Sequence, residues 1–248
     1  SDPDPLFTAK DPSGNPQPIT APITVAVDDV AGDTNYGKRF VFFGTGSYFR
    51  TSDPSDTQIQ SWYGLIDENA TISGRSSLMA RSVQTEGTVN GYPVRTFAEA
   101  TAGDMAGKKG WYIDLKTAGG VAQGERIVTE SKYYKLAEPT LIASSIIPVV
   151  DPCVPGGTGY VNAINPFTGG SLKLPFFDLN RNADYSDDML GNKVIGSVDV
   201  GVGMPSAPVL VGDELVVGGS SGETKSLKIN PGAPPLRGRI SWREIILN

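Results

Sequence analysis

The sequence contains no histidine and only one cysteine, Cys153, among its 248 residues. Without histidine, the chain cannot assemble a Ser-His-Asp or Cys-His nucleophile, and it cannot hold zinc through imidazole. A single cysteine cannot form a disulfide within the chain. Two interpretations of Cys153 remain open, because it is either a buried thiol or the partner of a cysteine outside this sequence.

Basic residues and long apolar runs are also scarce. The 21 Lys and Arg residues are outnumbered by 27 Asp and Glu residues, which gives a net charge of −6. This balance argues against binding to nucleic acid or to an anionic membrane surface. The longest apolar stretch, 141–150, is too short for a membrane span, which needs about 20 residues. No signal peptide is visible, and the opening Ser-Asp-Pro-Asp-Pro indicates a start inside a longer chain.

Turn residues and short strand-like segments dominate the sequence that is present. The 30 glycines and 19 prolines are spread along the chain, as expected when many short strands need many turns. No long window shows helical periodicity, and only a short helix near 96–105 is predicted. The three tryptophans, Trp62, Trp111 and Trp242, are predicted to lie in the core. An all-β fold is therefore predicted, with strands that include 39–43, 62–66, 111–115, 160–164 and 214–217.

A repeat is visible among these strands. An aromatic-rich strand ends in Asp or Asn and is followed by a glycine-containing turn, most clearly at 111–120 and 160–170. The Asp or Asn positions 67, 114 and 165 are spaced by 47 and 51 residues. A four-stranded propeller blade occupies roughly 40–50 residues, and propellers close with about 4–8 blades. We therefore predict a segment of about four blades from a larger ring, with 1–17 as a loop or interblade segment.

One segment, 178–188, concentrates oxygen ligands. Loops of the EF-hand type bind calcium through about 6–8 oxygens supplied from alternate positions. The ligand set predicted here takes position one at Asp178 and ends with Asp187, and position seven, Asp184, contributes its backbone carbonyl. In full, the predicted calcium ligands are Asp178, Asn180, Asn182, Asp184 and Asp187.

This loop departs from the usual pattern in two ways. Ala183 stands where position six normally has glycine, and fewer acids than usual are present, which predicts weaker binding. The identity of the last ligand is also left open, because Ser186 or Asp188 could serve in place of Asp187. The alternative to a calcium site is a polar surface loop rich in Asp and Asn turn residues.

Other motifs are interpreted structurally, and no catalytic residue is predicted. Asn69-Ala-Thr71 is expected to be an exposed turn, 44–46 a turn at a strand edge, and 218–222 a hairpin tip. Carboxylate pairs that could suggest glycosidase chemistry are interpreted as ordinary loop charges. These pairs are Asp53 with Asp56 and Glu125 with Glu130.

Several segments together resemble one known family. Their order and spacing are similar to those of the C-terminal propeller domain of the PilC/PilY family of type IV pilus tip proteins. The loop beginning at Asp178 falls at the place of that family's calcium loop, just after a Thr-Gly-Gly turn. The segments that carry the resemblance are 43–48, 55–58, 60–67, 110–115, 124–128, 151–153, 156–160, 165–170, 177–180 and 238–244.

The resemblance implies a modified, quinoprotein-like β-propeller, of which 1–248 would be the C-terminal portion. It further implies a non-enzymatic, calcium-binding factor at the pilus tip or outer membrane of a Gram-negative bacterium. Its implied partners are minor pilins and the pilus tip, and possible host-cell surfaces, and its roles are pilus extension and retraction, attachment and twitching motility. Two alternatives remain, a quinone-dependent dehydrogenase-like propeller enzyme and a metal-free adhesive module.

Overall fold

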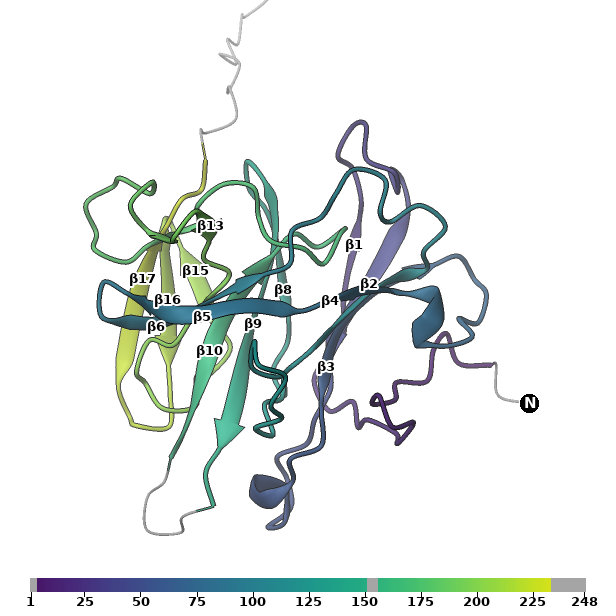
Figure 1. Ribbon diagram of the computed structural model, residues 1–248, viewed down its shortest axis with the longest axis horizontal. Coiled ribbons are helices and arrows are strands. Elements are labelled where there is room, and N and C mark those ends of the chain that lie inside the picture. Colours follow the sequence, from purple (N-terminus) through teal and green to yellow (C-terminus); the bar gives the residue numbers. More distant parts are fainter. Residues whose placement is uncertain (1–3, 151–155, 233–248) are drawn as a thin grey trace, which may run out of the picture.

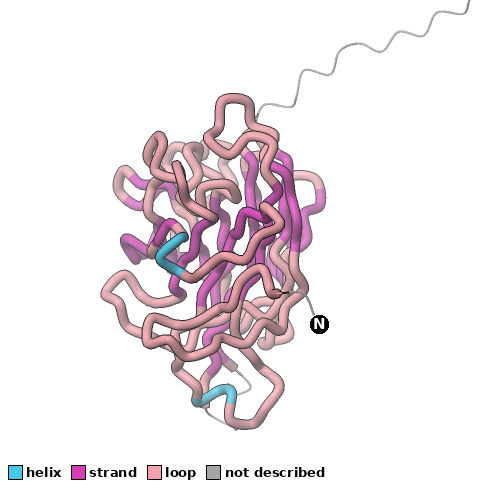
Figure 2. The backbone as a smooth tube through the Cα atoms, turned by 90° about the vertical axis from the view of Figure 1, so that its right-hand side faces the viewer, coloured by secondary structure: helices cyan, strands magenta, loops and turns pink. Residues whose placement is uncertain are grey.

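The computed structural model describes residues 4–150 and 156–232, and within them it contains strands and two 3-10 helices, Asp53–Ser55 and Arg75–Ser77 (Figure 1). Figure 2 shows the strands gathered in the middle of the molecule, with loops and the two short helices around them. Three features of the sequence analysis lie outside the described residues, namely Cys153, Trp242 and the segment 238–244.

The first sheet is formed mainly by the N-terminal half of the chain. Its strands pair antiparallel except for β4 and β7, which run parallel. The strong β formers in these segments, such as Phe40, Phe42 and Trp62, alternate with side chains on the opposite face. The strand order is β1 (Thr24–Val27), β2 (Arg39–Gly44), β3 (Ser61–Asp67), β7 (Gly110–Asp114) and β4 (Met79–Arg81).

The second sheet is reached directly from the first, because only one residue separates β4 from β5. These two strands run as a nearly continuous ribbon across Figure 1. The longest pairing joins β9 to β10, from Leu141 opposite Ile164 to Pro148 opposite Gly157. The strand order is β5 (Val83–Val89), β6 (Tyr92–Phe97), β14 (Ser197–Val198), β10 (Gly157–Ile164), β9 (Pro139–Pro148) and β8 (Lys132–Lys135).

The third sheet contains the last described strands and carries the predicted metal loop at the end of its first strand. A separate two-stranded hairpin, β12 (Met189–Leu190) with β13 (Lys193–Val194), follows that loop. The order of the third sheet is β11 (Phe177–Asp178), β17 (Thr224–Ile229), β16 (Glu214–Gly218) and β15 (Val209–Val211).

Two apolar cores separate the three sheets. The first core contains Trp62 and Trp111 from the first sheet and Leu141 from β9, all fully buried. The second core contains Ile142, the next residue of β9, together with Leu215 of the third sheet. Because successive side chains of a strand point to opposite faces, the second sheet contributes to both cores and is covered on both sides.

The N-terminal segment covers the outer face of the first sheet. Residues 4–17 form no strand, although an isolated bridge joins Lys10 to Pro16. Leu6 and Phe7 pack against a third apolar cluster that includes Tyr63 of β3. Both faces of the first sheet are therefore covered by apolar side chains, one by the first core and the other by this third cluster.

The predicted all-β class and all five predicted strands are confirmed, and Trp62 and Trp111 are core residues as predicted. The helix predicted over 96–105 is wrong. Thr96 lies in β6, and residues 101–108 form successive turns, closed for example by the Lys108 amide donating to the Met105 carbonyl. Gly103 and Gly107 adopt φ of +79° and +73°, which is incompatible with a right-handed helix.

The repeat does not divide the chain into equal blades. Its copies in β3 and β7 are neighbouring strands of one sheet, with Ser61 opposite Asp114. Between these two copies, the chain leaves the first sheet, forms the β5–β6 hairpin of the second sheet, and then returns to the first sheet. The 47-residue spacing therefore does not correspond to one blade. The described residues form three sheets of five, six and four strands and one two-stranded hairpin.

Candidate metal centre

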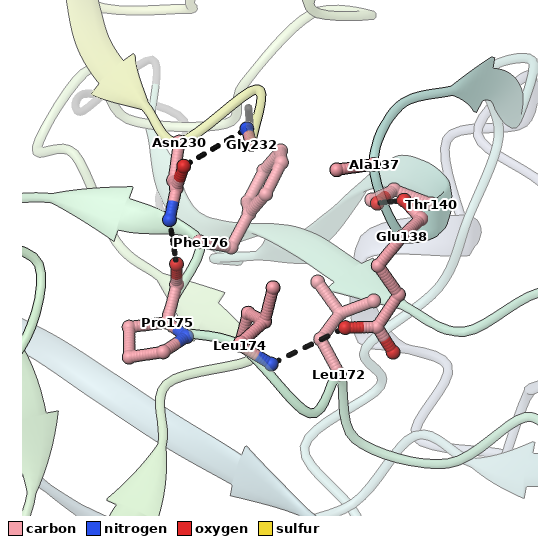
Figure 3. Close-up of a pocket in the computed structure, with 9 residues that line it drawn as sticks. All are labelled: Ala137, Glu138, Thr140, Leu172, Leu174, Pro175, Phe176, Asn230 and Gly232. Carbon is pink, nitrogen blue, oxygen red and sulfur yellow. Dashed lines mark hydrogen bonds between the residues drawn. The ribbon is translucent and has the colours of Figure 1, made fainter. Parts of the chain in front are cut away.

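The chain that enters the 178–188 loop is held in place before the loop begins. The Glu138 carboxylate accepts hydrogen bonds from the amides of Lys173 and Leu174. Figure 3 shows the contact with Leu174 and the Asn230 side chain, which donates to the Pro175 carbonyl at 3.2 Å. The cavity between these residues is only about 10 Å³, about the size of one water molecule. These residues therefore form a packing contact that fixes the chain before the loop, and the cavity is too small to be a ligand site.

Asp178 organises the first half of the loop. It ends β11, lies opposite Lys228 of β17, and its side chain is buried. Its Oδ1 accepts the amide hydrogen of Asn182 at 3.1 Å, and its Oδ2 accepts that of Ala183 at 3.0 Å. The loop therefore curls around this carboxylate, as expected for the first ligand of a calcium loop.

The alternate positions of the loop repeat one local contact. Asn180, Asn182 and Asp184 each accept, through a side-chain oxygen, the amide hydrogen of the residue two positions later, at 3.0, 2.7 and 3.0 Å. Such turns place every second side chain on the inner side of the curve. Ala183 adopts φ of +65°, the conformation for which position six usually requires glycine.

The second half of the loop closes over the first. The Asp187 carboxylate accepts hydrogen bonds from the side-chain amides of Asn180 at 3.0 Å and Asn182 at 2.8 Å. The Asp184 carboxylate instead binds the Ser186 hydroxyl at 2.6 Å, which holds the pKa of Asp184 below its usual value. Three of the predicted ligand side chains, those of Asn180, Asn182 and Asp187, therefore converge, whereas the Asp184 carboxylate hydrogen-bonds to Ser186.

Asp188 is buried and anchors the end of the loop. Its carboxylate accepts the Leu179 amide hydrogen at 3.0 Å and the side-chain amide of Asn90 at 2.7 Å. Burial raises the pKa of Asp188, and the nearby charges of Asp187 and Asp178 raise it further. Acidic groups thus repel one another at this end of the loop, which a cation would relieve.

The donor set of the loop fits calcium better than a softer metal. Among residues 4–150 and 156–232, no three His, Cys, Asp or Glu side chains converge closely enough to hold a metal by themselves. A cation in the loop would therefore also need amide, carbonyl or water oxygens, which calcium accepts at six to eight positions. Asp178, the amides of Asn180 and Asn182, and Asp187 supply such oxygens.

Sequence reasoning missed the contact from Asn90. This residue lies between β5 and β6, 98 positions before Asp188, and adopts φ of +49°. An Asn-Gly pair at 90–91 is a recognisable hairpin signal, yet it does not reveal which distant carboxylate the side chain binds. The assignment of the metal ligands stays a prediction.

The interpretation of Glu125 and Asp53 as ordinary loop charges is wrong. Glu125 is buried and pairs with Arg95 of β6 at 2.6 Å, while the Arg95 guanidinium lies 3.7 Å from the centre of the Tyr160 ring. Asp53 is also buried and accepts the amide hydrogens of Phe49 and Arg50. Both carboxylates are therefore buried structural groups, one in an ion pair and the other in a hydrogen-bonded turn.

Comparison with known proteins indicates one family. The chain is 39% identical over 244 residues to a type IV pilus biogenesis factor PilY1 homolog from Xylella fastidiosa, covering 98% of this chain and 19% of that protein. It is 30% identical over 267 residues to type IV pilus biogenesis factor PilY1 from Pseudomonas aeruginosa, covering 97% of this chain and 22% of that protein. No family model matches the sequence.

The fold agrees with these relatives. The structure superposes on the crystal structure of the C-terminal domain of Pseudomonas aeruginosa PilY1 with a TM-score of 0.71 and 22% identity, covering 92% of this chain and 48% of that one. This chain is a PilY1-family C-terminal domain. The predicted propeller-like class is confirmed by the match to the PilY1 domain.

The PilY1 relatives are much longer than this chain. The chain spans about a fifth of the length of the PilY1 proteins it matches, 19% and 22% of the two described above. Across residues 4–150 and 156–232, none of the helices is long and apolar enough to cross a membrane.

Proposed function

We propose that this PilY1-family domain is the calcium-responsive part of a type IV pilus biogenesis factor. Two observations support the proposal: the relatives are named type IV pilus biogenesis factors, and the 178–188 loop carries oxygen donors at alternate positions and curls around the Asp178 carboxylate. The observation that carries the proposal is the Asp178 carboxylate, buried at position one and accepting the amide hydrogens of positions five and six.

Calcium in this loop would act as a structural switch and not as a catalyst. The loop joins β11 of the third sheet to Asn90 at the tip of the β5–β6 hairpin, so its order affects two sheets together. Without the cation, repulsion among Asp178, Asp187 and Asp188 favours a looser loop. With the cation, the same residues present a fixed surface to a partner.

We propose a wider role at the pilus because the relatives are named type IV pilus biogenesis factors. The proposed partners are minor pilins and the pilus tip, with a host-cell surface as a further one, at the pilus tip or outer membrane of a Gram-negative bacterium. The proposed consequences are control of pilus extension and retraction, surface attachment and twitching motility. The domain is proposed to work without enzymatic activity, in keeping with relatives named as biogenesis factors.

The test is a calcium titration of the purified chain by calorimetry. Asp178→Ala is expected to lower calcium affinity by about tenfold or more, because it removes a direct charged ligand. Glu223→Ala is the matched control, since Glu223 is an exposed acid on the β16–β17 connection. Equal affinity in wild type and Asp178→Ala would rule out this loop as the site.

A second variant distinguishes the loss of a calcium ligand from the loss of folding. Asp187→Ala removes an exposed carboxylate whose hydrogen bonds, among residues 4–150 and 156–232, come from two side chains, so the loop backbone keeps its amide contacts. It is also expected to weaken calcium binding, while the thermal midpoint in chelator stays close to that of wild type. In the full-length protein, both variants should reduce twitching zones, and twitching that is unaffected despite lost calcium binding would refute the regulatory role.

A further inference from the structure

A second carboxylate, far from the loop in sequence, has one oxygen that finds no hydrogen-bond partner within the described part of the chain. Asp28 follows β1 directly and is fully buried. Its backbone is fixed by the loop that it opens, because its amide donates to the Lys38 carbonyl and its carbonyl accepts from the Gly37 amide. Its Oδ1 accepts the Val30 amide hydrogen at 3.1 Å, whereas Oδ2 has no hydrogen-bond partner among the described residues.

This arrangement is costly unless something neutralises the charge. Burying an ionised carboxylate without compensation is strongly unfavourable. Burial raises the pKa of Asp28 to about 6, and the negative charges of Asp33 and Asp29 contribute. The carboxylate is therefore still mostly ionised at neutral pH, and Asp29 cannot help because it is itself an acid, paired outward with Lys135.

Asp28 lies against a cavity that has the donors to provide compensation. The cavity is about 270 Å³ and lies between the β1–β2 loop and the turns at 100–105 and 167–168. The β1–β2 loop contributes further side-chain oxygens to its lining, from Asp33, Thr34 and the buried Asn35. Asp104 also lines it, but its charge is already matched by Arg81 at 2.8 Å.

We propose that this cavity binds a second hard divalent cation through Asp28 Oδ2, with Asp33 and Asn35 as further ligands. Their oxygens are of the kind that calcium prefers, and the cavity leaves room for the water molecules that would complete its shell. The site involves none of the residues of the 178–188 loop, so it does not depend on the function proposed for that loop. The bound cation would join the β1–β2 loop to the 100–105 turn.

Lys173 offers the main competing explanation. It also lines the cavity, and an exposed lysine could reach inward to pair with Asp28. The two explanations predict different effects for Lys173→Gln, one on cation affinity and the other on fold stability. Removing a nearby positive charge should tighten cation binding, whereas removing a true partner of Asp28 should destabilise the fold in chelator.

The test is calcium calorimetry on the whole chain with Asp178→Ala already in place, which isolates the second site. One binding event is expected to remain, and adding Asp28→Asn is expected to weaken it by at least tenfold. Asp29→Asn is the matched control, because this neighbouring acid is exposed and pairs with Lys135, so the substitution is expected to weaken binding far less than Asp28→Asn. Asn keeps the acceptor for the Val30 amide, and a thermal midpoint in chelator no lower than that of the parent shows that the variant is folded.

The outcomes separate this proposal from the one for the loop. If Asp178→Ala binds no calcium at all, or if Asp28→Asn leaves the remaining event unchanged, the second site is wrong. If Lys173→Gln lowers the midpoint in chelator and Asp28→Asn adds no further loss, Asp28 pairs with Lys173 and the proposal is again wrong. If wild type and Asp178→Ala bind alike while Asp28→Asn loses affinity, the second site stands and the loop fails.

Discussion

Ala183 occupies a backbone conformation that suits glycine, with φ of +65°, while its amide donates to Asp178. An L-residue in this region of backbone conformation costs about 1–2 kcal/mol. Glycine removes this cost, but it makes the unfolded chain more flexible, which lowers stability by about 0.4–1 kcal/mol. Ala183→Gly is therefore expected to raise the unfolding free energy by about 0.5–1 kcal/mol and to tighten calcium binding, as measured by denaturant titration and calorimetry. Ala106→Gly, at an exposed position without positive φ, should instead lower stability.

Asp28 gives the protein a pH dependence whose sign can be stated. Because the folded-state pKa is raised from 3.8 to about 6, the folded protein holds its proton more tightly than the unfolded chain. Its contribution to stability is therefore present below about pH 4 and is lost as pH rises through about 6, by at most about 3 kcal/mol.

The expected result for Asp28→Asn in chelator is a flatter pH profile of unfolding free energy between pH 4 and 7. The comparison with wild type isolates Asp28 from the other charged groups around it, which are Asp29, Asp33, Asp104, Lys173 and the Tyr133 hydroxyl. A profile that is as steep in the variant as in wild type would show that Asp28 is not the titrating group.

At this scale, the sequence predicted which polar side chains alternate along the loop but not their surroundings. Alternation from Asp178 to Asp187 is a local pattern, and the structure shows the matching local turns. The missing partner of Asp28 Oδ2 and the contact from Asn90 depend on residues brought together by the fold. Neither can be read from spacing along the chain.

The Thr-Gly-Gly turn after β10 shows why one element of the repeat needs glycine. Gly169 adopts φ of +67°, and an added Cβ would lie 2.4 Å from the Trp111 ring, whose Nε1 donates to the Pro166 carbonyl at 2.6 Å. In the other copy, Gly120 adopts φ of +83° but faces open space. The same motif is therefore a packing contact in one place and only a turn in the other.

Gly169→Ala is expected to destabilise the protein more than Gly120→Ala. Both substitutions carry the backbone cost of about 1–2 kcal/mol, and the clash with Trp111 adds about 1–3 kcal/mol at position 169 only. Denaturant unfolding of the two variants measures the difference, and tryptophan fluorescence should change only for Gly169→Ala. Equal destabilisation would contradict the importance of the Trp111 contact.

Strand positions were predictable, whereas the assignment of strands to sheets was not. Segments such as 39–43 and 214–217 carry their own β propensity and turn signals. The return of β7 to β3 and the insertion of the two-residue β14 between β6 and β10 depend on long-range pairing. The helix expected over 96–105 was wrong for a local reason, since Gly103 within it adopts a positive φ.

At the scale of the whole molecule, the candidate calcium loop bridges two sheets. Asp178 ends β11 in the third sheet, and Asp188 binds Asn90, which belongs to the hairpin of the second sheet. The first sheet contacts the second through a separate core built around Trp62 and Trp111. The loop is therefore positioned to affect one sheet interface and not the other.

Calcium removal is accordingly expected to loosen the molecule unevenly. In chelator, amide hydrogen exchange should become faster in β11, in β17, which pairs with it, and at the tip of the β5–β6 hairpin. The β2–β3 pair should keep its protection, because the Trp62 core that covers it does not contact the loop. Asp178→Ala measured in calcium should reproduce the chelator pattern, since it mimics the unbound state. Faster exchange spread equally over all three sheets would mean that calcium acts on global stability and not through this bridge.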